Sequence, residues 1–479
     1  MSKGVTGLAT DVTNTSLPRS GLIGRARAHR VFTPLRGNGL KALALRGSAW
    51  TIAGYGTGQV LRLGSNLILT RLLIPEAFGL MALVNVFMHG LQMFSDVGIG
   101  TSIIQHKRGE DPNFLNTAWA LQIFRGALLG AIAFAASGPM AEFYGDRRIS
   151  SILLILSVCA LLQGFDSIGR YLATGRLHAH RIVGVTLGAA VIQIGVSIII
   201  AVITGSVMSL AWGQLAGVAS TVLLGHLFFD PHSHRFSLSK EHAIDVLSFG
   251  GWLALNTVAG FLAISIDRFT IPRLVSMKEF GLYSVAAMFA MLPFIMSQRL
   301  ASSIMFPALA RVAKDNRIER LRRALHRSRR GIMIGVSGLV CATMLSGPAF
   351  FALVYPPEYH EAWIPVLSLG PFVWLSSFKF STDRVLLALR EGRLLFTSNA
   401  VRVLGSIAGA AGGWSFAQMP GFVLGLAIGP LAGYLVCIIY LYRRDLVRVR
   451  EECVILGLGA VLLSASAAGG WLLLGLVGP

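Results

Sequence analysis

RGSAWTIAGYGTGQVLRLGSNLILTRLLIPEAFGLMALVNVF, residues 46–87, is the stretch that decides the fold. It holds two apolar runs joined by a short turn at Arg71, and each run has the length of about 20 residues that an α-helix needs to cross a membrane. Similar runs recur throughout the 479 residues, of which 54% are hydrophobic and 13% charged, with a mean hydropathy of +0.66. Soluble domains carry about 25% charged residues, and disordered chains have low hydrophobicity. The composition therefore excludes both classes and predicts an all-α, polytopic membrane protein.

Apolar runs of this length predict thirteen spans. The last span could form a re-entrant hairpin at Gly469-Gly470, so that twelve to fourteen transmembrane helices remain open. The predicted spans are Gly47–Leu69, Ala77–Thr101, Phe114–Ser137, Ile149–Tyr171, Ile182–Thr204, Val207–Phe229, Val246–Ile271, Phe280–Phe306, Gly331–Tyr355, Ala362–Leu389, Leu394–Trp414, Gly421–Tyr442 and Cys453–Val477.

The net charge of +20 follows the predicted topology. If the N-terminal tail lies in the cytoplasm, 30 of the 42 Lys+Arg fall on that side, counting Arg170 at the inner edge of its span, and only five fall in the opposite loops. Cytoplasmic loops of membrane proteins carry such an excess. We therefore predict a cytoplasmic N-terminus and a basic, flexible tail over residues 1–46. Because topology accounts for the charge, the basic composition gives no reason to expect nucleic-acid binding.

The longest loop on the inner side, residues 311–330, is strongly basic. Ile318, Leu321 and Leu325 recur in it at helical spacing. Two arrangements remain open: an amphipathic helix lying on the anionic inner leaflet, or a solvated linker with a charged face.

The sequence contains an internal repeat. A shift of 202 residues aligns LTRLLIPEAFGLMALVNVF (Leu69–Phe87) with IPRLVSMKEFGLYSVAAMF (Ile271–Phe289), and Arg-Leu followed by Phe-Gly-Leu keeps one spacing in both. The shift takes the first span onto the seventh, so that both copies cross the membrane in the same direction. This predicts two pseudo-symmetric six-helix bundles, with domain bounds as follows: 47–229 and 246–442 for the bundles, 230–245 for a cytoplasmic linker, and 443–479 for one or two further transmembrane helices.

The equivalent residues Arg71 and Arg273 fall in the same outer turn of each copy. We expect them to mark the outer interface, and a role in substrate binding is the alternative.

Three stretches resemble a known family. Residues 46–87 and FSDVGIGTSIIQHKRGED (Phe94–Asp111) resemble the start of polysaccharide-export flippases, the Wzx-like members of the multidrug/oligosaccharidyl-lipid/polysaccharide exporter superfamily. SIDRFTIPRLVSMKEFGLYSVAAMFAMLP (Ser265–Pro293) is similar to the corresponding second-half repeat. The resemblance covers residues 47–442 and is most specific in the first two spans.

The resemblance implies a transporter rather than an enzyme. The implied activity is the translocation of an undecaprenyl-pyrophosphate-linked oligosaccharide across a bacterial cytoplasmic (inner) membrane, for O-antigen, capsule or exopolysaccharide biosynthesis. A V-shaped cavity between the bundles would hold the polar head and work by alternating access, while the polyprenyl tail stays in the bilayer. Membrane lipids, a polysaccharide polymerase and a chain-length regulator are further candidate partners, and no cofactor is expected.

Charged residues inside the spans are costly and usually face a cavity or a partner. With Arg170, at the inner edge of its span, counted in the adjoining loop, the spans hold seven cations and four acids, an excess of three positive charges. A pyrophosphate needs cations that form charge-assisted hydrogen bonds, so the excess has the sign expected for an anionic lipid-linked cargo. The candidate substrate-binding cations are Arg62, Arg125, Arg299, Arg402, Arg268, Lys379 and Arg384, and the candidate ion-coupling or gate residues are Asp267, Asp383 and Asp96.

The cations differ in their structural alternatives. Arg62 and Arg125 have no acid one turn away on their own span and are the preferred cavity cations. Arg299 and Arg402 could instead extend toward the inner surface. Lys379 is followed by an acid four residues later, so that pairing along the helix competes with cavity lining.

The acids have alternatives too. Asp166 is expected to pair with Arg170, four residues on. Asp267 could couple transport to an ion or form an outer-gate salt bridge with Arg268. Asp96 is favoured as a structural cap or gate over a proton site.

Glycines and a proline inside spans could act as bend points or allow close helix packing, and packing is favoured. These residues are Gly251, Gly260, Gly425, Gly429 and Pro430.

Two other function classes compete. An ion-coupled multidrug exporter of the same superfamily would be expected to have an acid-rich cavity, whereas the intramembrane balance is positive. A polysaccharide polymerase or ligase would need acid/base residues grouped on an accessible loop, and the outer loops offer one local cluster at Glu358–Glu361. The flippase is the preferred reading.

Overall fold

The computed structural model describes residues 40–95, 98–105, 109–176, 178–229, 235–239, 242, 261, 265, 267–306, 309, 312, 318–389 and 391–477. This part of the chain is helical and contains no strand. Its helices are α1 (Leu40–Leu69), α2 (Pro75–Phe94), α3 (Ile99–Gln105), α4 (Pro112–Tyr144), α5 (Arg148–Gly164), α6 (Gly169–Gly175), α7 (Ala179–Thr204), α8 (Met208–Phe228), α10 (Met277–Ala290), α11 (Leu292–Leu300), η2 (Ala301–Met305), α13 (Ile318–Val354), η3 (Pro357–Ala362), α14 (Trp363–Ala388), α15 (Gly392–Gly425), α16 (Ile428–Arg443) and α17 (Val449–Val477).

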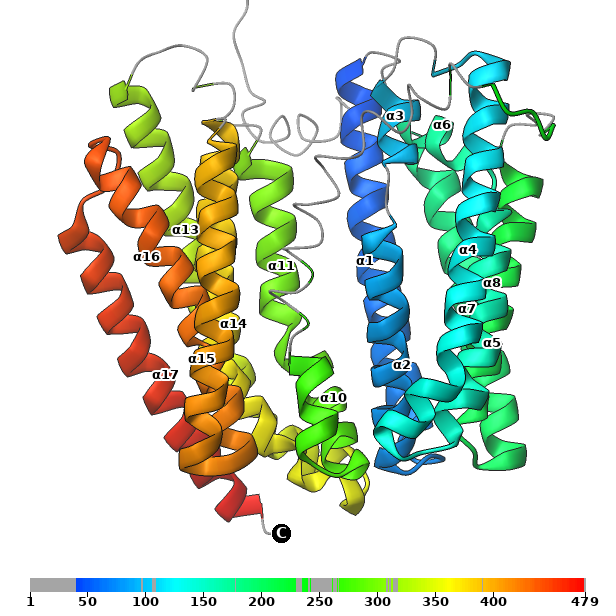
Figure 1. The fold of residues 1–479 in the computed structure, drawn as a ribbon. Helices are drawn as coiled ribbons and strands as arrows, with labels where there is room; N and C mark the ends of the chain where they lie inside the picture. Colours follow the sequence, from blue (N-terminus) through cyan, green and yellow to red (C-terminus); the bar gives the residue numbers. More distant parts are fainter. Residues whose placement is uncertain are drawn as a thin grey trace, which may run out of the picture.

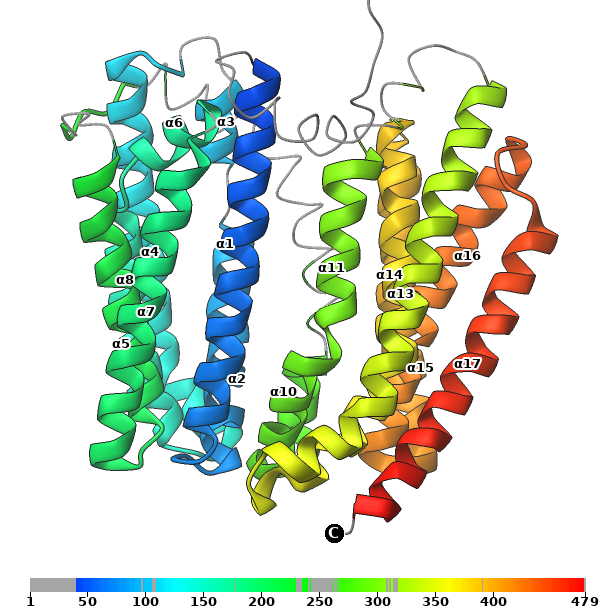
Figure 2. The same cartoon turned by 180° about the vertical axis from the view of Figure 1, so that it is seen from behind.

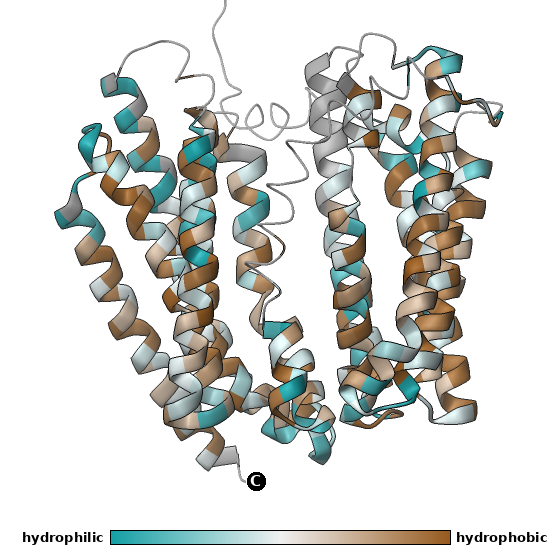
Figure 3. Cartoon of the chain, in the orientation of Figure 1, coloured by the Kyte–Doolittle hydropathy of each residue, from teal (hydrophilic) through white to brown (hydrophobic). Residues whose placement is uncertain are grey.

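The long helices have the length and the surface of membrane spans. Among the described residues, eight helices are long and apolar enough to cross a membrane, or nine if the bent pair α5–α6 counts as one span. Large apolar side chains point outward from them: Ile203 on α7 and Leu227 on α8 are each 75% exposed. Hydrophobic residues dominate the middle of the helices in Figure 3. The chain is a multi-pass membrane protein, and the count of thirteen stays a prediction because span Val246–Ile271 lies largely outside the described residues.

The helices form two bundles that stand side by side (Figures 1 and 2). Helices α1–α8 build one bundle, called here the N-half, and α10–α17 build the other, the C-half. We call the end that carries α3 and α6 the inner end, because the charge distribution predicts it to be cytoplasmic, and the opposite end the outer end. At the outer end α2 lies against α10, and from there the described helices of the two halves diverge, which gives the V shape that the resemblance implied.

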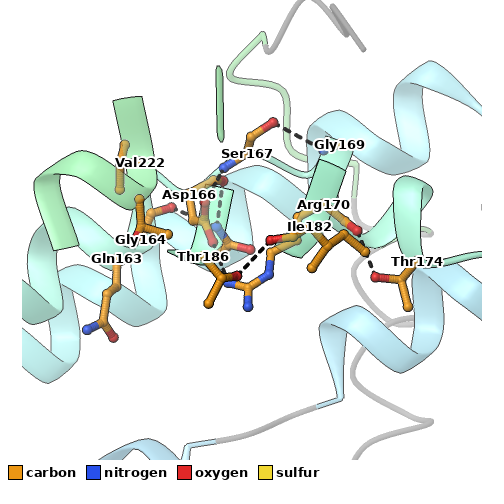
Figure 4. Close-up of polar contacts among 12 residues, drawn as sticks. Gln163, Gly164, Asp166, Ser167, Gly169, Arg170, Thr174, Ile182, Thr186 and Val222 are labelled. Atoms are coloured by element: carbon orange, nitrogen blue, oxygen red, sulfur yellow. Dashed lines mark hydrogen bonds and ion pairs between the residues drawn. The ribbon is translucent and has the colours of Figure 1, made fainter. Parts of the chain in front are cut away.

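Two predicted spans are broken. The span Ala77–Thr101 was expected to be continuous, but α2 ends at Phe94 and Ser95 caps it. The span Ile149–Tyr171 bends by 61° between α5 and α6. Figure 4 shows the break, where the side chains of Asp166 and Ser167 accept hydrogen bonds from nearby backbone N–H groups. Such local bonds compete with the helix, so polar residues rather than apolar length decide where these helices end.

Helix α15 contains a reversal of the chain at Ala417–Gln418, where the backbone leaves helical geometry and Gln418 has a φ of 45°. Glycines on the two arms face each other, and a Cβ added at Gly409 would overlap the carbonyl oxygen of Gly425. The arms therefore pack as an antiparallel pair, as the two predicted spans Leu394–Trp414 and Gly421–Tyr442 require.

Two of the glycines singled out in the sequence pack closely, and they also flank the break between α15, which ends at Gly425, and α16, which begins at Ile428. Gly425 lies against Gly409, and Gly429 against the Arg402 carbonyl and Ser406. Small residues allow such close contact between membrane helices. Gly251 and Gly260 lie outside the described residues.

Two further expectations concern the C-half. From residue 318 the basic loop is helical and forms the start of α13, a single 37-residue helix, and its position on the inner leaflet stays a prediction. At the C-terminus α17 continues through Gly469-Gly470, and the re-entrant hairpin is wrong.

Candidate functional site

The two halves meet at the outer end through repeat-equivalent residues. Gly79 of α2 and Gly281 of α10 are 202 positions apart, and a Cβ added at Gly281 would overlap the carbonyl oxygen of Pro75. A Cβ on Gly79 would in turn lie 2.5 Å from the carbonyl oxygen of Met277. Only glycine permits this approach of two backbones. The equivalent Phe-Gly-Leu segments of the two repeats, one on α2 and one on α10, therefore contact each other, near the axis that relates the halves.

Side chains of the C-half reinforce this contact. Tyr355 donates to Asn66 Oδ1 at 2.8 Å, and the Tyr359 hydroxyl of η3 donates to the Leu73 carbonyl oxygen at 2.6 Å. Burial raises the pKa of Tyr359, which keeps its hydroxyl protonated and able to donate. The ring of Tyr359 also packs edge-on against Phe78. The outer end is therefore closed by close backbone packing and by hydrogen bonds between the halves.

Arg273 belongs to the same outer contact. It donates to the Phe143 carbonyl oxygen at 2.8 Å, and its guanidinium lies 4.6 Å from the centre of the Phe143 ring. Arg273 therefore joins the halves at the outer end, and its predicted position at the outer interface of the membrane stays a prediction. Its equivalent Arg71 is exposed in the turn after α1.

A cleft of about 700 Å³ opens in the N-half, among α2, α3, α4, α5 and α6 near the inner end. Its polar lining includes Gln92, Gln122, Arg125, Gln163 and Arg170. Arg125 donates to Ser95 Oγ at 2.9 Å and to the Gln92 carbonyl oxygen at 2.7 Å, groups that carry no negative charge. Arg125 lines this cleft within the N-half, and its role as a substrate-binding cation stays a prediction.

The break between α5 and α6 shapes this cleft. Gln122 of α4 donates to the Gly164 and Asp166 carbonyl oxygens, at 3.2 and 2.9 Å, which the broken helix leaves without helical partners. A Cβ on Gly126 would lie 2.7 Å from Gly164 Cα, so that α4 and α5 can touch there. Arg170 pairs with Asp166 at 3.3 Å, as its spacing predicted. Small and amide-bearing residues thus hold open a polar cleft at membrane depth.

The C-half buries its charges instead. Lys379 of α14 has no exposed surface, and it donates to Asp383 and, at 3.1 Å, to Asn399 Oδ1 of α15. Of the two alternatives for this pair, mutual pairing is the one observed. Asp383 is also the one acid that interacts electrostatically with Arg402 and Arg384 within the described part of the chain.

Arg402 is 4% exposed, and its only hydrogen bond among the described residues, to Ser376 Oγ, is 3.4 Å long. Arg384 lies 4.4 Å from the centre of the Phe380 ring. Gly433 makes room for two of these cations, because a Cβ there would lie 2.8 Å from Lys379 Cε and 3.1 Å from Arg402 Cβ. Lys379, Asp383, Arg384 and Arg402 form what we call the C-half cluster, three cations around one acid. Arg402 does not extend to the surface.

The other predicted residues are dispersed. Arg62 is exposed on α1 and makes no ion pair with another described residue. Arg299 of α11 is exposed, with its guanidinium 4.6 Å from the centre of the Tyr55 ring of α1, in the opposite half. Asp96 lies outside the described residues.

Asp267 does not form the expected outer-gate salt bridge. It is 3% exposed and accepts a hydrogen bond from Tyr283 of α10. No ion pair with Arg268 occurs within the described ranges, and Arg268 acts on Asp267 through its nearby charge and a backbone hydrogen bond. Sequence reasoning, which followed charges, missed Tyr283, Tyr355 and Tyr359; Asn66, a polar residue inside the first span, was the available signal.

The described helices define a two-bundle exporter fold. A solved inward-facing MATE-family multidrug resistance transporter of the MOP superfamily is 19% identical, with a TM-score of 0.64, over 81% of this chain and 94% of that one. The lipid II flippase MurJ, in an inward closed conformation, is 12% identical, with a TM-score of 0.69, over 87% of this chain and 92% of that one. At these identities the likeness concerns the fold alone.

The family follows from the sequence comparisons. Residues 68–365 match the family described as polysaccharide biosynthesis protein, and the chain belongs to that family. It is similar to the succinoglycan biosynthesis transport protein ExoT of Rhizobium meliloti (strain 1021), with 25% identity over 63% of this chain. The match spans 60% of the length of that relative. The resemblance seen in the first two spans is thereby confirmed.

Proposed function

We propose that this protein is a flippase that moves an undecaprenyl-pyrophosphate-linked oligosaccharide across the bacterial cytoplasmic membrane, with its N-terminus in the cytoplasm. The cargo would serve O-antigen, capsule or exopolysaccharide biosynthesis. The observation that carries the proposal is the N-half cleft, where a cation without an acidic partner faces a space of about 700 Å³. Family membership and the transport protein among the relatives support the same activity.

The closed outer contact supports alternating access. In the observed state the halves touch at the outer end through Gly79 and Gly281 and diverge toward the inner end. A head group that entered from the inner end would meet Arg125 before any route to the outer end opened. Arg125 supplies charge-assisted donors of the kind that bind phosphate oxygens. Separation of the Gly79 and Gly281 backbones would then open the outer side.

An ion-coupled multidrug exporter is the second candidate, because the MATE transporter shares the fold. The charges of the described sites oppose it for cationic drugs. The N-half cleft is lined by Arg125, which has no acidic partner among the described residues, and by Arg170, which pairs with Asp166. The C-half cluster has three cations around Asp383. A cationic drug would meet repulsion at both places.

Complementation of a bacterial strain that lacks its own polysaccharide flippase tests the proposal. Surface polysaccharide should return with a matched lipid-linked substrate. Arg125→Ala should lower the transport rate about ten-fold or more, because a hydrogen bond to a charged group contributes about 1.5–3 kcal/mol. Arg125→Lys keeps the charge and should retain part of the activity.

Arg147→Ala, which removes an exposed arginine at the outer end, is the matched control and should behave as the wild type. Protein abundance in the membrane, measured in parallel, separates lost transport from lost folding. Full transport by Arg125→Ala would remove Arg125 from the cargo path, and failure to restore any matched polysaccharide would refute the flippase.

A further inference from the structure

A second polar pocket lies outside the N-half cleft and the C-half cluster. It occupies about 270 Å³ between the start of α13 and the start of α17, at the inner end. In Figures 1 and 2 these two helix ends lie at the periphery of the C-half, away from the N-half. The pocket is therefore separate from the route proposed for the cargo.

The acids of this pocket are already engaged. Glu452 accepts hydrogen bonds from Arg329 Nη1 at 2.9 Å and from Tyr434. Glu451 pairs with His326 at 3.1 Å and more distantly with Arg448. The remaining cations of the lining therefore have no acid to neutralise them within the pocket.

Those remaining cations are Arg322, Arg323 and Arg330, and none forms an ion pair with another described residue. A buried hydrogen-bond donor also indicates an anionic ligand. Arg329 is 3% exposed, lines the pocket, and has an Nε atom without a hydrogen-bond partner among the described residues. A buried donor without a partner is costly unless a ligand satisfies it. The pocket is thus built for an anion.

The surroundings identify the source of the anion. Met333 of α13 and Ile455 of α17 form apolar parts of the lining, one helical turn beyond Arg329 and Glu451. Beyond them the same helices expose apolar side chains, with Ile334 and Leu458 each 61% exposed. A ligand seated here would have its charge among arginines and its remainder along lipid-facing helices. Basic pockets between helices at the inner side of a membrane suit lipid head groups.

We propose that the pocket between α13 and α17 binds the phosphate head group of an anionic phospholipid of the inner leaflet. The phosphate accepts hydrogen bonds from Arg322, Arg330 and Arg329 Nε, and the acyl chains run along the apolar faces of both helices. The lipid would join α17 to the rest of the C-half.

Native mass spectrometry of the detergent-purified full-length protein tests this with added phosphatidylglycerol, phosphatidylcholine or inorganic phosphate. Phosphatidylglycerol should bind in preference to phosphatidylcholine. Each of Arg322→Ala and Arg330→Ala should weaken phosphatidylglycerol binding about five-fold, the effect of one basic residue near an anionic lipid. Arg327→Ala removes the same charge from α13 outside the pocket lining and should change nothing.

Three results would overturn the proposal. The first is equal binding of phosphatidylcholine and phosphatidylglycerol, which would show that the head-group charge is not recognised. The second is an equal loss in Arg327→Ala, which would indicate non-specific attraction. The third is binding of inorganic phosphate that depends on Arg322 and Arg330 without any preference for the lipid, which would make the pocket a free-anion site.

Discussion

The two halves share a fold and a repeat, yet they place their intramembrane cations in opposite environments. In the N-half, Arg125 lines an open cleft and is held by a hydroxyl and a carbonyl oxygen. In the C-half, Lys379 and Arg402 are buried, and they surround Asp383. A cation held by neutral groups keeps its charge available to a ligand, whereas the charge of a cation paired with a buried acid is neutralised by that acid.

This difference sharpens the meaning of the cationic excess. The sequence contains three more cations than acids inside the predicted spans, which suggested a shared cationic cavity. The structure brings together only the members of the C-half cluster and leaves Arg62, Arg125 and Arg299 apart. We infer that cargo recognition belongs to the N-half and that the C-half cluster stabilises its own bundle.

The largest effect is expected where a buried pair is broken. Lys379→Met should destabilise the protein by about 3–5 kcal/mol, because it removes the cation that pairs directly with Asp383 and donates a hydrogen bond to it. Thermal unfolding of the detergent-purified protein, together with its abundance in the membrane, should reveal this loss. The double variant Lys379→Met/Asp383→Leu should recover only part of the stability, because buried Arg402 then has no acid nearby among the residues that the structure describes.

Arg125→Ala provides the contrast, since its partners are neutral and its abundance should stay near that of the wild type. If Lys379→Met folded normally and lost only transport, the C-half cluster would act on the cargo, and the division between the halves would be wrong.

A smaller effect is expected at the place where the halves are equivalent. Gly281→Ala puts a methyl group onto the Pro75 carbonyl oxygen, and overpacking of this kind costs about 1–3 kcal/mol. The cost falls on the closed outer contact, so the population should shift toward a state with the outer end open. A cysteine at Leu282, buried at 4% exposure, should react faster with a membrane-impermeant maleimide.

The four native cysteines are replaced first, and Gly138→Ala is the control, because a Cβ there meets no atom within 4 Å. Unchanged labelling in Gly281→Ala would mean that α2 and α10 do not control outer access.

The fold was largely predictable from the sequence because a membrane makes length and apolarity decisive. Runs of about 20 apolar residues indicate helices that cross a membrane. The repeat then indicates that the two copies cross in the same direction. The prediction of a continuous span was wrong for Ile149–Tyr171, because the side chains of Asp166 and Ser167 accept local hydrogen bonds that end the helix. The length of an apolar run does not show where single polar residues of this kind end the helix.

The site was less predictable because a sequence lists charges without their distances. Spacing along one helix correctly identified the pairs Asp166–Arg170 and Lys379–Asp383. It could not show that Asp267 meets Tyr283, or that Arg329 meets Glu452, 123 positions away. These contacts depend on helix packing, which is set by glycines and apolar surfaces and not by the charged residues themselves.

The smallest effect is expected at the one described contact where a candidate cation of the C-half reaches the N-half. The guanidinium of Arg299 lies over the Tyr55 ring at 4.6 Å, and a cation–π contact at an exposed site contributes about 0.5–1 kcal/mol. Tyr55→Leu should therefore lower the melting temperature slightly, while Tyr55→Phe, which keeps the ring, should not. In the double variant with Arg299→Ala, the second change should add nothing, because the contact is already gone. Independent, additive effects would show that the two residues do not interact, and would leave the outer contact around Gly79 and Gly281 as the principal link between the halves.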